Sequence, residues 1–256
     1  MFDSSRMKAV HALWDAMAQP PAGSDTRKQL MSELCRLVGA DTAVWTALVR
    51  LGGSGDRFRG WRFRAMQYLH PNTYEDGGAR YQRELDQGQG DEIVVRGLAE
   101  VGTFRAYRVR DLVSPAWLKT PAWEQRYVAN GVHDLLYLAS PVNADLEVTI
   151  TLFRTVQRPL FTAEERDLGA QAVSALRWLY LRQLLELGLH IASEPVTRME
   201  RSVLKGLLAG KSDKEIAASL ERSIRTVNAH VAALLAKYGV KTRTELMALW
   251  VGATGA

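Results

Sequence analysis

The chain has 256 residues, of which 47% are apolar and 24% are charged, and its formal net charge is +5. This length accommodates two domains, and the apolar share supplies a sizeable core, which excludes a disordered chain. The sequence has no apolar run of the roughly eighteen residues that would span a bilayer, and its N-terminus lacks a signal-peptide pattern. Its single cysteine, Cys35, excludes an internal disulfide and a cysteine-based zinc site. We therefore expect a cytoplasmic protein without a metal or cofactor.

Residues 1–190 predict an α+β domain with a mainly antiparallel sheet flanked by helices. Helical spacing of apolar residues predicts helices over 4–18 and 25–38, and runs of β-branched and aromatic residues predict strands over 42–51 and 61–69. Further predicted elements follow in chain order: helices over 74–85 and 92–99, a strand over 103–109, a helix over 115–130, strands over 134–142 and 146–154, and one long helix over 162–189. About five strands in consecutive hairpin-like order give the sheet.

After a linker at 191–196, residues 197–256 predict a second domain of four short helices. A hydroxyl residue three positions before a glutamate is the pattern of a capping box, and it occurs at Thr197, Ser212 and Thr242. Ser223 predicts the cap of another helix, and Gly239 its end. The two helices within 212–240 are joined by a turn that is only a few residues long. They therefore predict a helix-turn-helix.

The second helix of this pair has one apolar face and one face of small residues. Val227, Val231 and Leu234 recur at three- and four-residue steps and so share one face. The opposite face presents Arg225, Ala229, Ala232 and Ala236, with Asn228 and His230 on its flanks. Small residues let a helix backbone sit deep in a groove.

The net charge belongs to the second domain. Residues 195–256 contain ten of the 33 Lys and Arg and five of the 28 Asp and Glu, which leaves 23 of each sign in the first 194 residues. A net positive charge in the second domain alone is what we expect if that domain binds DNA phosphates and the first does not.

The second domain carries a pattern made up of these residues: Thr197, Glu200, Val203, Leu204, Gly210, Lys211, Ser212, Lys214, Glu215, Ile216, Ala217, Leu220, Ser223, Thr226, Val227, His230, Lys237, Gly239, Val240, Arg243, Glu245 and Leu246. Over about sixty residues it resembles the DNA-binding domain of the LuxR/FixJ family of bacterial transcription factors. Two positions depart from the family pattern, since Met199 replaces an arginine and Tyr238 replaces a leucine. Neither departure lies on the predicted DNA-facing surface.

The resemblance implies a homodimer that binds double-stranded DNA with residues 224–238 in the major groove. It places Asn228, Ala229 and Ala232 at the bases. The resemblance, or a positive charge, predicts phosphate contacts for seven residues: Lys211, Lys214, Ser223, Arg225, Thr226, Lys237 and Lys241. We expect His230 to pack against the preceding helix.

The element order of residues 1–190 is similar to that of the GAF/PAS-like sensor domains often joined to this DNA-binding domain. A candidate small-molecule pocket consists of Trp45, Trp61, Tyr68, Tyr81, Asp91, Trp117, Trp123 and Tyr127. Tyr81 and Asp91 partly resemble the signal-binding stretch of acyl-homoserine-lactone receptors, but Glu92 replaces its proline and Gly77 its tryptophan. We therefore favour packing for Tyr81 and a helix cap for Asp91.

Three functional hypotheses remain open from the sequence. The first is a DNA-binding transcription regulator controlled by a small molecule or a partner at residues 1–190. In the second, these residues serve only dimerisation or protein interaction. The third, an enzyme, is disfavoured by scattered histidines, one cysteine and the lack of a G-x-S-x-G motif or a phosphate loop, so no catalytic residue is expected.

Overall fold

The computed structural model describes residues 4–19, 25–50, 61–70, 87, 90–143, 146–155, 157–187 and 196–251. The chain divides into two compact units, Met1–Gln183 and Leu184–Ala256. The helix predicted over 74–85, Tyr81 and most of the predicted linker lie outside the described residues. Among the helices that the structure does describe, none is long and apolar enough to cross a membrane.

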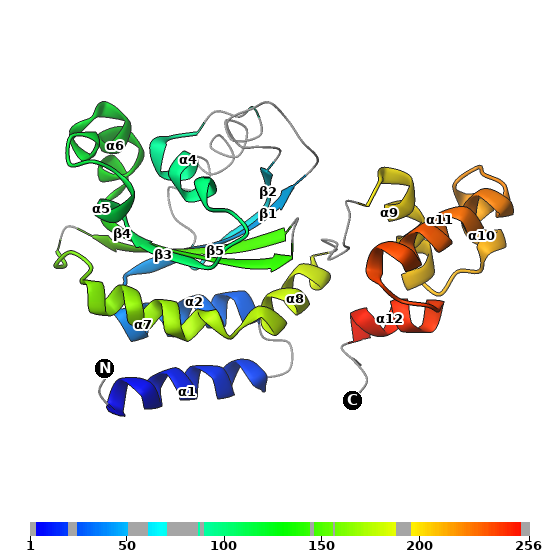
Figure 1. Ribbon diagram of the computed structural model, residues 1–256, viewed down its shortest axis with the longest axis horizontal. Helices are drawn as coiled ribbons and strands as arrows, with labels where there is room; N and C mark the ends of the chain where they lie inside the picture. Colours follow the sequence, from blue (N-terminus) through cyan, green and yellow to red (C-terminus); the bar gives the residue numbers. More distant parts are fainter. Residues whose placement is uncertain are drawn as a thin grey trace. The chain divides into compact units, whose positions relative to one another are not determined.

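The first unit is built on a five-stranded antiparallel sheet flanked by helices, which confirms the predicted fold class (Figure 1). The strands are β1 (Thr42–Arg50), β2 (Trp61–Tyr68), β3 (Arg105–Arg108), β4 (Val132–Asn143) and β5 (Leu146–Thr155). Their order across the sheet is β2-β1-β5-β4-β3.

This order corrects the expected consecutive arrangement, because β1 pairs with β5 as well as with β2. Six successive residues in the middle of β1 are buried. Such a strand lies inside a sheet, where helices or strands cover both faces and a neighbour pairs along each edge. The last strand of the unit, β5, therefore pairs with the first strand, β1.

The helices on one side of the sheet are α1 (Ser4–Ala18), α2 (Thr26–Val38) and α7 (Ala163–Ser174), and α8 (Arg177–Glu186) follows α7. In Figure 1, α2 and α7 lie along the sheet and α1 lies outside them. The start of α2 is fixed by Asp25, whose carboxylate accepts from the N–H groups of Arg27 and Lys28. Its end is fixed by Gly39, whose φ of 66° lies in the left-handed region that favours glycine.

The single long helix predicted over 162–189 is wrong, since the structure breaks it between α7 and α8. Ala175 closes α7, and the N–H groups of Leu179 and Tyr180 restart the helical pattern from the carbonyl of Leu176. Neither proline nor glycine marks the break. The apolar side chains on both sides of it are buried, and this tertiary packing carries no local signature in the sequence.

Shorter helices lie on the other side of the sheet: α4 (Glu92–Ala99), α5 (Val109–Leu112), η1 (Trp117–Lys119), α6 (Pro121–Arg126) and η2 (Val128–Asn130). They correct the single helix predicted over 115–130. Pro121 forces the preceding Thr120 into an extended conformation, with φ −82° and ψ 154°. Thr120 then caps α6, with Pro121 as its first residue.

The second unit contains the four predicted helices, here α9 (Arg198–Leu208), α10 (Asp213–Ser219), α11 (Ile224–Tyr238) and α12 (Arg243–Val251). The capping boxes predicted at Thr197 and Ser212 are present, and Gly239 ends α11 in the left-handed region. The helices enclose one small buried core: Val196, Val203, Leu204, Leu207, Ile216, Ala217, Val227, Val231, Leu234 and Leu246.

Candidate nucleic-acid interface

Helices α10 and α11 form the two arms of the helix-turn-helix. The chain reverses between them at Glu221, whose φ of 52° lies in the left-handed region. Ser223 then opens α11: its hydroxyl oxygen accepts from the N–H of Thr226, and the two hydroxyl oxygens lie 2.8 Å apart. Both side chains that were predicted to contact phosphate therefore also fix the start of the helix.

Helix α11 has the two faces that its sequence predicts. Val227, Val231 and Leu234 are buried in the core of the unit. The exposed residues opposite this face are Arg225, Ala229, Ala232 and Ala236, and Ile224 and Asn228 are exposed at its edge. The three predicted base-facing residues are therefore accessible, and Asn228 supplies the single amide among them.

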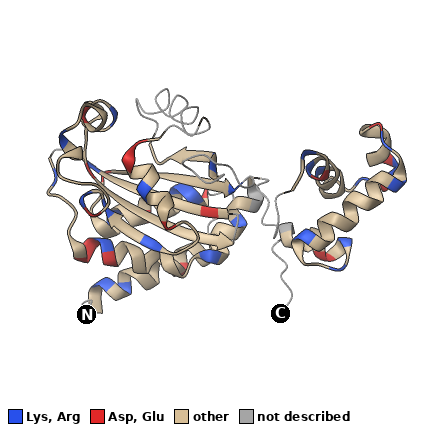
Figure 2. Ribbon diagram, turned by 45° about the horizontal axis from the view of Figure 1, so that its top comes forward, with Lys and Arg blue, Asp and Glu red and all other residues tan. Residues whose placement is uncertain are grey.

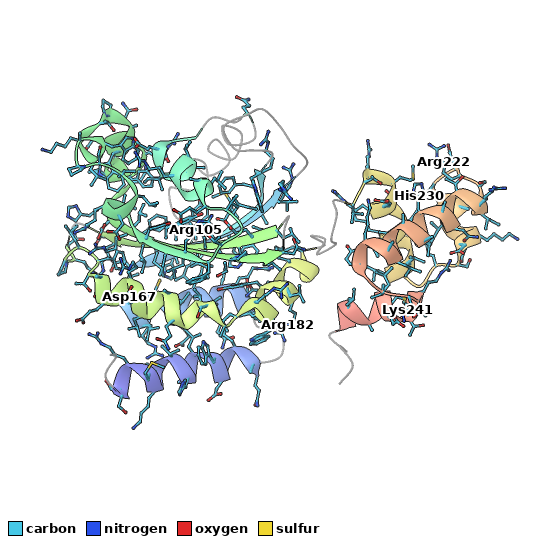
Figure 3. The ribbon with its side chains drawn as sticks, in the orientation of Figure 1. Arg105, Asp167, Arg182, Arg222, His230 and Lys241 are labelled. Carbon is cyan, nitrogen blue, oxygen red and sulfur yellow. The ribbon has the colours of Figure 1, made fainter. Side chains whose placement is uncertain are left out.

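Four of the predicted phosphate contacts, Lys211, Lys214, Arg225 and Lys241, are exposed. None of the four forms an ion pair with another residue in the described part of the chain. Figure 2 marks the Lys and Arg of this unit in blue, and Figure 3 places Lys241 where the chain enters α12. Their charges can therefore neutralise phosphates without first breaking an ion pair.

Lys237 differs from these four cations. Its ammonium lies 2.8 Å from a carboxylate oxygen of Glu200, and the two side chains are only 16% and 7% exposed. Burial disfavours the ionised carboxylate, but hydrogen bonds from Lys237 and Thr197 outweigh it and hold the pKa of Glu200 below its usual value. A phosphate role for Lys237 stays a prediction, and this geometry argues against it, because the ion pair joins α11 to α9.

The packing predicted for His230 is not tested by any contact described for it. Its side chain is half-buried on α11, at the position labelled in Figure 3. The helix that it shares with Lys237 packs closely against α9.

In the first unit, the structure gathers only part of the candidate pocket. Tyr68, Trp117, Trp123 and Tyr127 belong to one apolar cluster on the side of the sheet that carries α4 to α6. Trp123 stacks on Tyr127 with ring centroids 4.6 Å apart and meets Trp117 edge-on at 5.9 Å. These contacts are also those of an aromatic core.

The other two tryptophans of the candidate pocket lie elsewhere. Trp61 belongs to a separate cluster with Leu48, Phe63 and Leu98. Trp45 is fully buried on the opposite face of the sheet, where the guanidinium of Arg27 from α2 lies 5.7 Å from its ring centre. Successive residues of a strand point to opposite faces, so Trp45 cannot join the cluster that contains its neighbour Val44.

Asp91 caps α4, as favoured from the sequence. One carboxylate oxygen accepts from the N–H of Val94 at 3.1 Å, and the other accepts from Arg126 and from the hydroxyl of Tyr127, each at 3.0 Å. The side chain is 4% exposed. Asp91 therefore links α4 to α6 and its neighbouring turn.

A buried ion pair that was not predicted from the sequence joins Arg105 on β3 to Glu147 on β5 (Figure 3 labels Arg105). Two N–H···O bonds of 2.8 and 2.7 Å join their side chains, which are 2% and 0% exposed. Arg105 also donates to the carbonyls of Gly97 and Thr103. Alternation places Glu147 on the same face of its strand as Thr149 and Thr151, so the sequence carries no signal that this carboxylate is buried.

Comparison with known proteins identifies the second unit. The family model of "Bacterial regulatory proteins, luxR family" matches residues 194–250. These residues form a LuxR-type helix-turn-helix domain. The predicted resemblance is confirmed, and α10 and α11 are the helix-turn-helix of this LuxR-type domain.

The curated relatives agree with this assignment. The uncharacterized transcriptional regulatory protein YhcZ of Bacillus subtilis is 52% identical over 50 residues, which are 20% of this chain and 23% of that protein. The transcriptional regulatory protein UhpA of Salmonella typhimurium is 47% identical over 53 residues, which are 21% of this chain and 27% of UhpA. The chain spans only about a quarter of the curated relatives that it matches.

Solved structures resemble the chain beyond the LuxR-type domain. A structure of SdiA in complex with octanoyl-rac-glycerol has a TM-score of 0.50 and 16% identity and covers 100% of this chain and 98% of that chain. A crystal structure of Escherichia coli SdiA in the space group P6522 has the same score and identity, with coverages of 98% and 99%. At this identity the likeness shows the fold.

Proposed function

We propose that this chain is a homodimeric, sequence-specific DNA-binding transcription regulator that acts in the cytoplasm. The observation that supports it most is the exposed face of α11 in a LuxR-type domain, with Asn228 among alanines and a buried face opposite. In helix-turn-helix proteins the second helix lies in the major groove. Helix α11 would bind there, with its N-terminal half at the base edges.

The exposed side chains suit a division between base reading and phosphate binding. An asparagine amide can bond an adenine at two points, and an alanine methyl can contact a thymine methyl. Lys211, Lys214, Arg225 and Lys241 would bind phosphates on either side, which positions the helix without reading sequence. Because one domain offers few base contacts, two copies on an inverted repeat would supply the remaining specificity.

The first test is to sequence the DNA fragments that the purified full chain retains, and then to measure binding of variants to the recovered site. Asn228→Ala should lose about 1–3 kcal/mol of discrimination between the site and a site changed at one adenine. Lys214→Ala should weaken binding to all sequences by a similar factor. Lys205, an exposed lysine on α9, supplies the control, and Lys205→Ala should bind as the unchanged chain does.

The opposite pattern contradicts the assignment. If Asn228→Ala keeps full discrimination while Lys214→Ala removes it, the division between base and phosphate contacts fails. If the full chain retains no preferred sequence, the proposed function itself fails.

We further propose that a small molecule bound to the first unit controls the regulator. The structurally similar SdiA was solved with octanoyl-rac-glycerol, and the cluster of Trp117, Trp123 and Tyr127 beside Asp91 combines apolar surface with polar groups. These are the components of small-molecule sites in proteins. The GAF/PAS-like sensor role of this unit belongs to the same proposal.

The competing hypothesis is that the first unit only dimerises or binds another protein. Mass spectrometry of small molecules released from the purified chain, and thermal shifts against fractionated metabolites, distinguish the two. A ligand that raises the melting temperature of the chain and changes its DNA affinity supports control. Dimerisation at all concentrations tested, with no ligand and no shift, supports the competing hypothesis.

A further inference from the structure

We propose that Ile224 reads the 5-methyl group of a thymine in the DNA site, beside the adenine that Asn228 would contact. This inference rests on the proposed function, since it requires α11 to lie in the major groove. Isoleucine is usually a core residue, whereas Ile224 is exposed, and this contact would make Ile224 a determinant of DNA sequence specificity.

Ile224 has the surface of a binding residue. It is 47% exposed, the largest exposed fraction among the large apolar side chains described in the structure. It belongs neither to the buried core of the LuxR-type domain nor to the half-buried residues that pack against that core. Core packing therefore does not account for an isoleucine at this position.

Local folding does not account for it either. Ile224 is the first residue of α11, directly after the Ser223 cap. Acidic residues and proline are favoured at the first position of a helix, whereas a β-branched residue is a weak helix former. Neither helix formation nor core packing uses this side chain, so its surface is available for a contact with DNA.

The position of Ile224 points to the bases. With about 3.6 residues per turn, Ile224 lies one turn before Asn228 and between Val231 and Asn228 around the helix axis, at the edge of the buried face, with Arg225 next to it in the chain. The side chains of Ile224, Arg225 and Asn228 are exposed. The N-terminal end of a recognition helix is the part that reaches the base edges.

The apolar character of Ile224 selects the partner within the groove. The thymine methyl is the apolar group that the bases present in the major groove, and apolar side chains recognise it by contact. Four residues of helix rise about 6 Å, and base pairs are about 3.4 Å apart. The thymine should therefore lie within about two base pairs of the adenine that Asn228 reads.

Replacing thymine by uracil tests this contact, because uracil lacks only the methyl group. In the DNA site selected by the full chain, each thymine of a half-site is replaced in turn, and affinity is measured by equilibrium binding. One uracil should weaken binding of the unchanged chain about fourfold, the value expected for one buried methyl group. At the thymine that Ile224 contacts, Ile224→Ala should bind the thymine and uracil sites equally, because the shorter side chain loses the contact, whereas Ile224→Val should keep most of the preference. Any thymine that Ala229 or Ala232 contacts should keep its preference in Ile224→Ala.

Met247 provides a matched control, since it is another exposed apolar residue of the same domain, with 36% of its surface exposed. Met247→Ala should keep the full preference for thymine. The inference is overturned if every thymine tolerates uracil, or if Ile224→Ala keeps the preference at every thymine that responds to uracil, as it would if Ile224 contacted another protein. In both cases DNA binding stands, whereas a chain that selects no DNA sequence overturns the proposed function as well.

Discussion

Glu200 and Lys237 make the stability of the LuxR-type domain dependent on pH. Burial opposes ionisation of Glu200, but the bonds from Lys237 and Thr197 lower its pKa in the folded state below the ordinary 4.5. A lowered folded-state pKa contributes stability that is present above the unfolded value and is lost as pH falls through the folded value. Protonation at low pH would remove the ion pair that joins α11 to α9.

We predict that Glu200→Gln destabilises the domain by about 1.5–3 kcal/mol at neutral pH, the usual contribution of hydrogen bonds to a charged group. Calorimetric unfolding of the full chain between pH 7 and 3 measures the difference from the unchanged chain. The difference should narrow once pH falls below 4.5. A difference that stays constant over this range would show that the pair does not titrate as its contacts require.

Arg105 and Glu147 hold the edge of the sheet to the residues after α4. Both side chains are almost fully buried and joined by two hydrogen bonds, so loss of one partner leaves the other charge without compensation. We predict that Glu147→Gln lowers the free energy of unfolding by about 3–5 kcal/mol, measured by denaturant titration. The double variant Arg105→Met, Glu147→Leu should recover much of this loss. Equal losses in the single and double variants would exclude an effect of the unpaired charge.

At the scale of the elements, the close packing of α9 on α10 depends on a glycine in the middle of α9. A Cβ atom at Gly206 would lie 2.7 Å from Cγ1 of Ile216, which is fully buried. Glycine costs about 1 kcal/mol relative to alanine inside a helix, so its presence indicates that the contact matters more than helix propensity.

We predict that Gly206→Ala destabilises the LuxR-type domain by about 1–3 kcal/mol, the typical cost of overpacking. Gly169 in α7 is the matched control, because a Cβ there would meet its nearest neighbours at 3.4–3.5 Å, an ordinary contact distance. Gly169→Ala should therefore leave the melting temperature unchanged or raise it. Calorimetry of both variants checks the pair, and a stabilising Gly206→Ala would show that α9 and α10 can separate without cost.

At the scale of the whole molecule, the net charge of the chain is confined to its LuxR-type domain, and this determines how DNA binding responds to salt. Each phosphate neutralised by a lysine or arginine releases condensed counterions, and the slope of log affinity against log salt changes by about 0.9 for each contact. Lys211, Lys214, Arg225 and Lys241 are exposed and make no ion pair within the described residues, so they are the expected contributors.

We predict that Lys214→Ala reduces this slope by about 0.9 for a bound monomer and by about 1.8 for a homodimer, which loses two contacts. Binding of a fixed DNA site over a series of salt concentrations measures the slope. Lys205→Ala, with its lysine on α9, should leave it unchanged. An affinity independent of salt would contradict the nucleic-acid hypothesis.

The helices of the LuxR-type domain could be predicted from the sequence because their signals are local. The hydroxyl and carboxylate of a capping box are three residues apart, and the apolar residues of α11 recur within one or two turns. Asn228, Ala229 and Ala232 could be placed on its exposed face for the same reason. The cap at Asp91 is equally local.

The remaining features depend on residues that are far apart in the chain. Trp45 and Trp123 were grouped by composition, but the alternation of β1 places Trp45 on the opposite face of the sheet. The sequence placed Lys237 among the surface cations. In the folded chain its ammonium lies 2.8 Å from a carboxylate oxygen of Glu200, which is 37 residues away in the sequence. The pairing of Arg105 with Glu147 joins residues on two strands that are not neighbours in the sheet.

The sequence by itself therefore determined the helix-turn-helix, its exposed face and the domain that carries the net charge, because helix caps, helical periodicity and charge are properties of short segments. Only the tertiary structure decided the strand order, the break between α7 and α8 and which charged side chains are paired. These three features depend on contacts between segments that are distant in the chain, and no short sequence pattern predicts the free energy of such contacts.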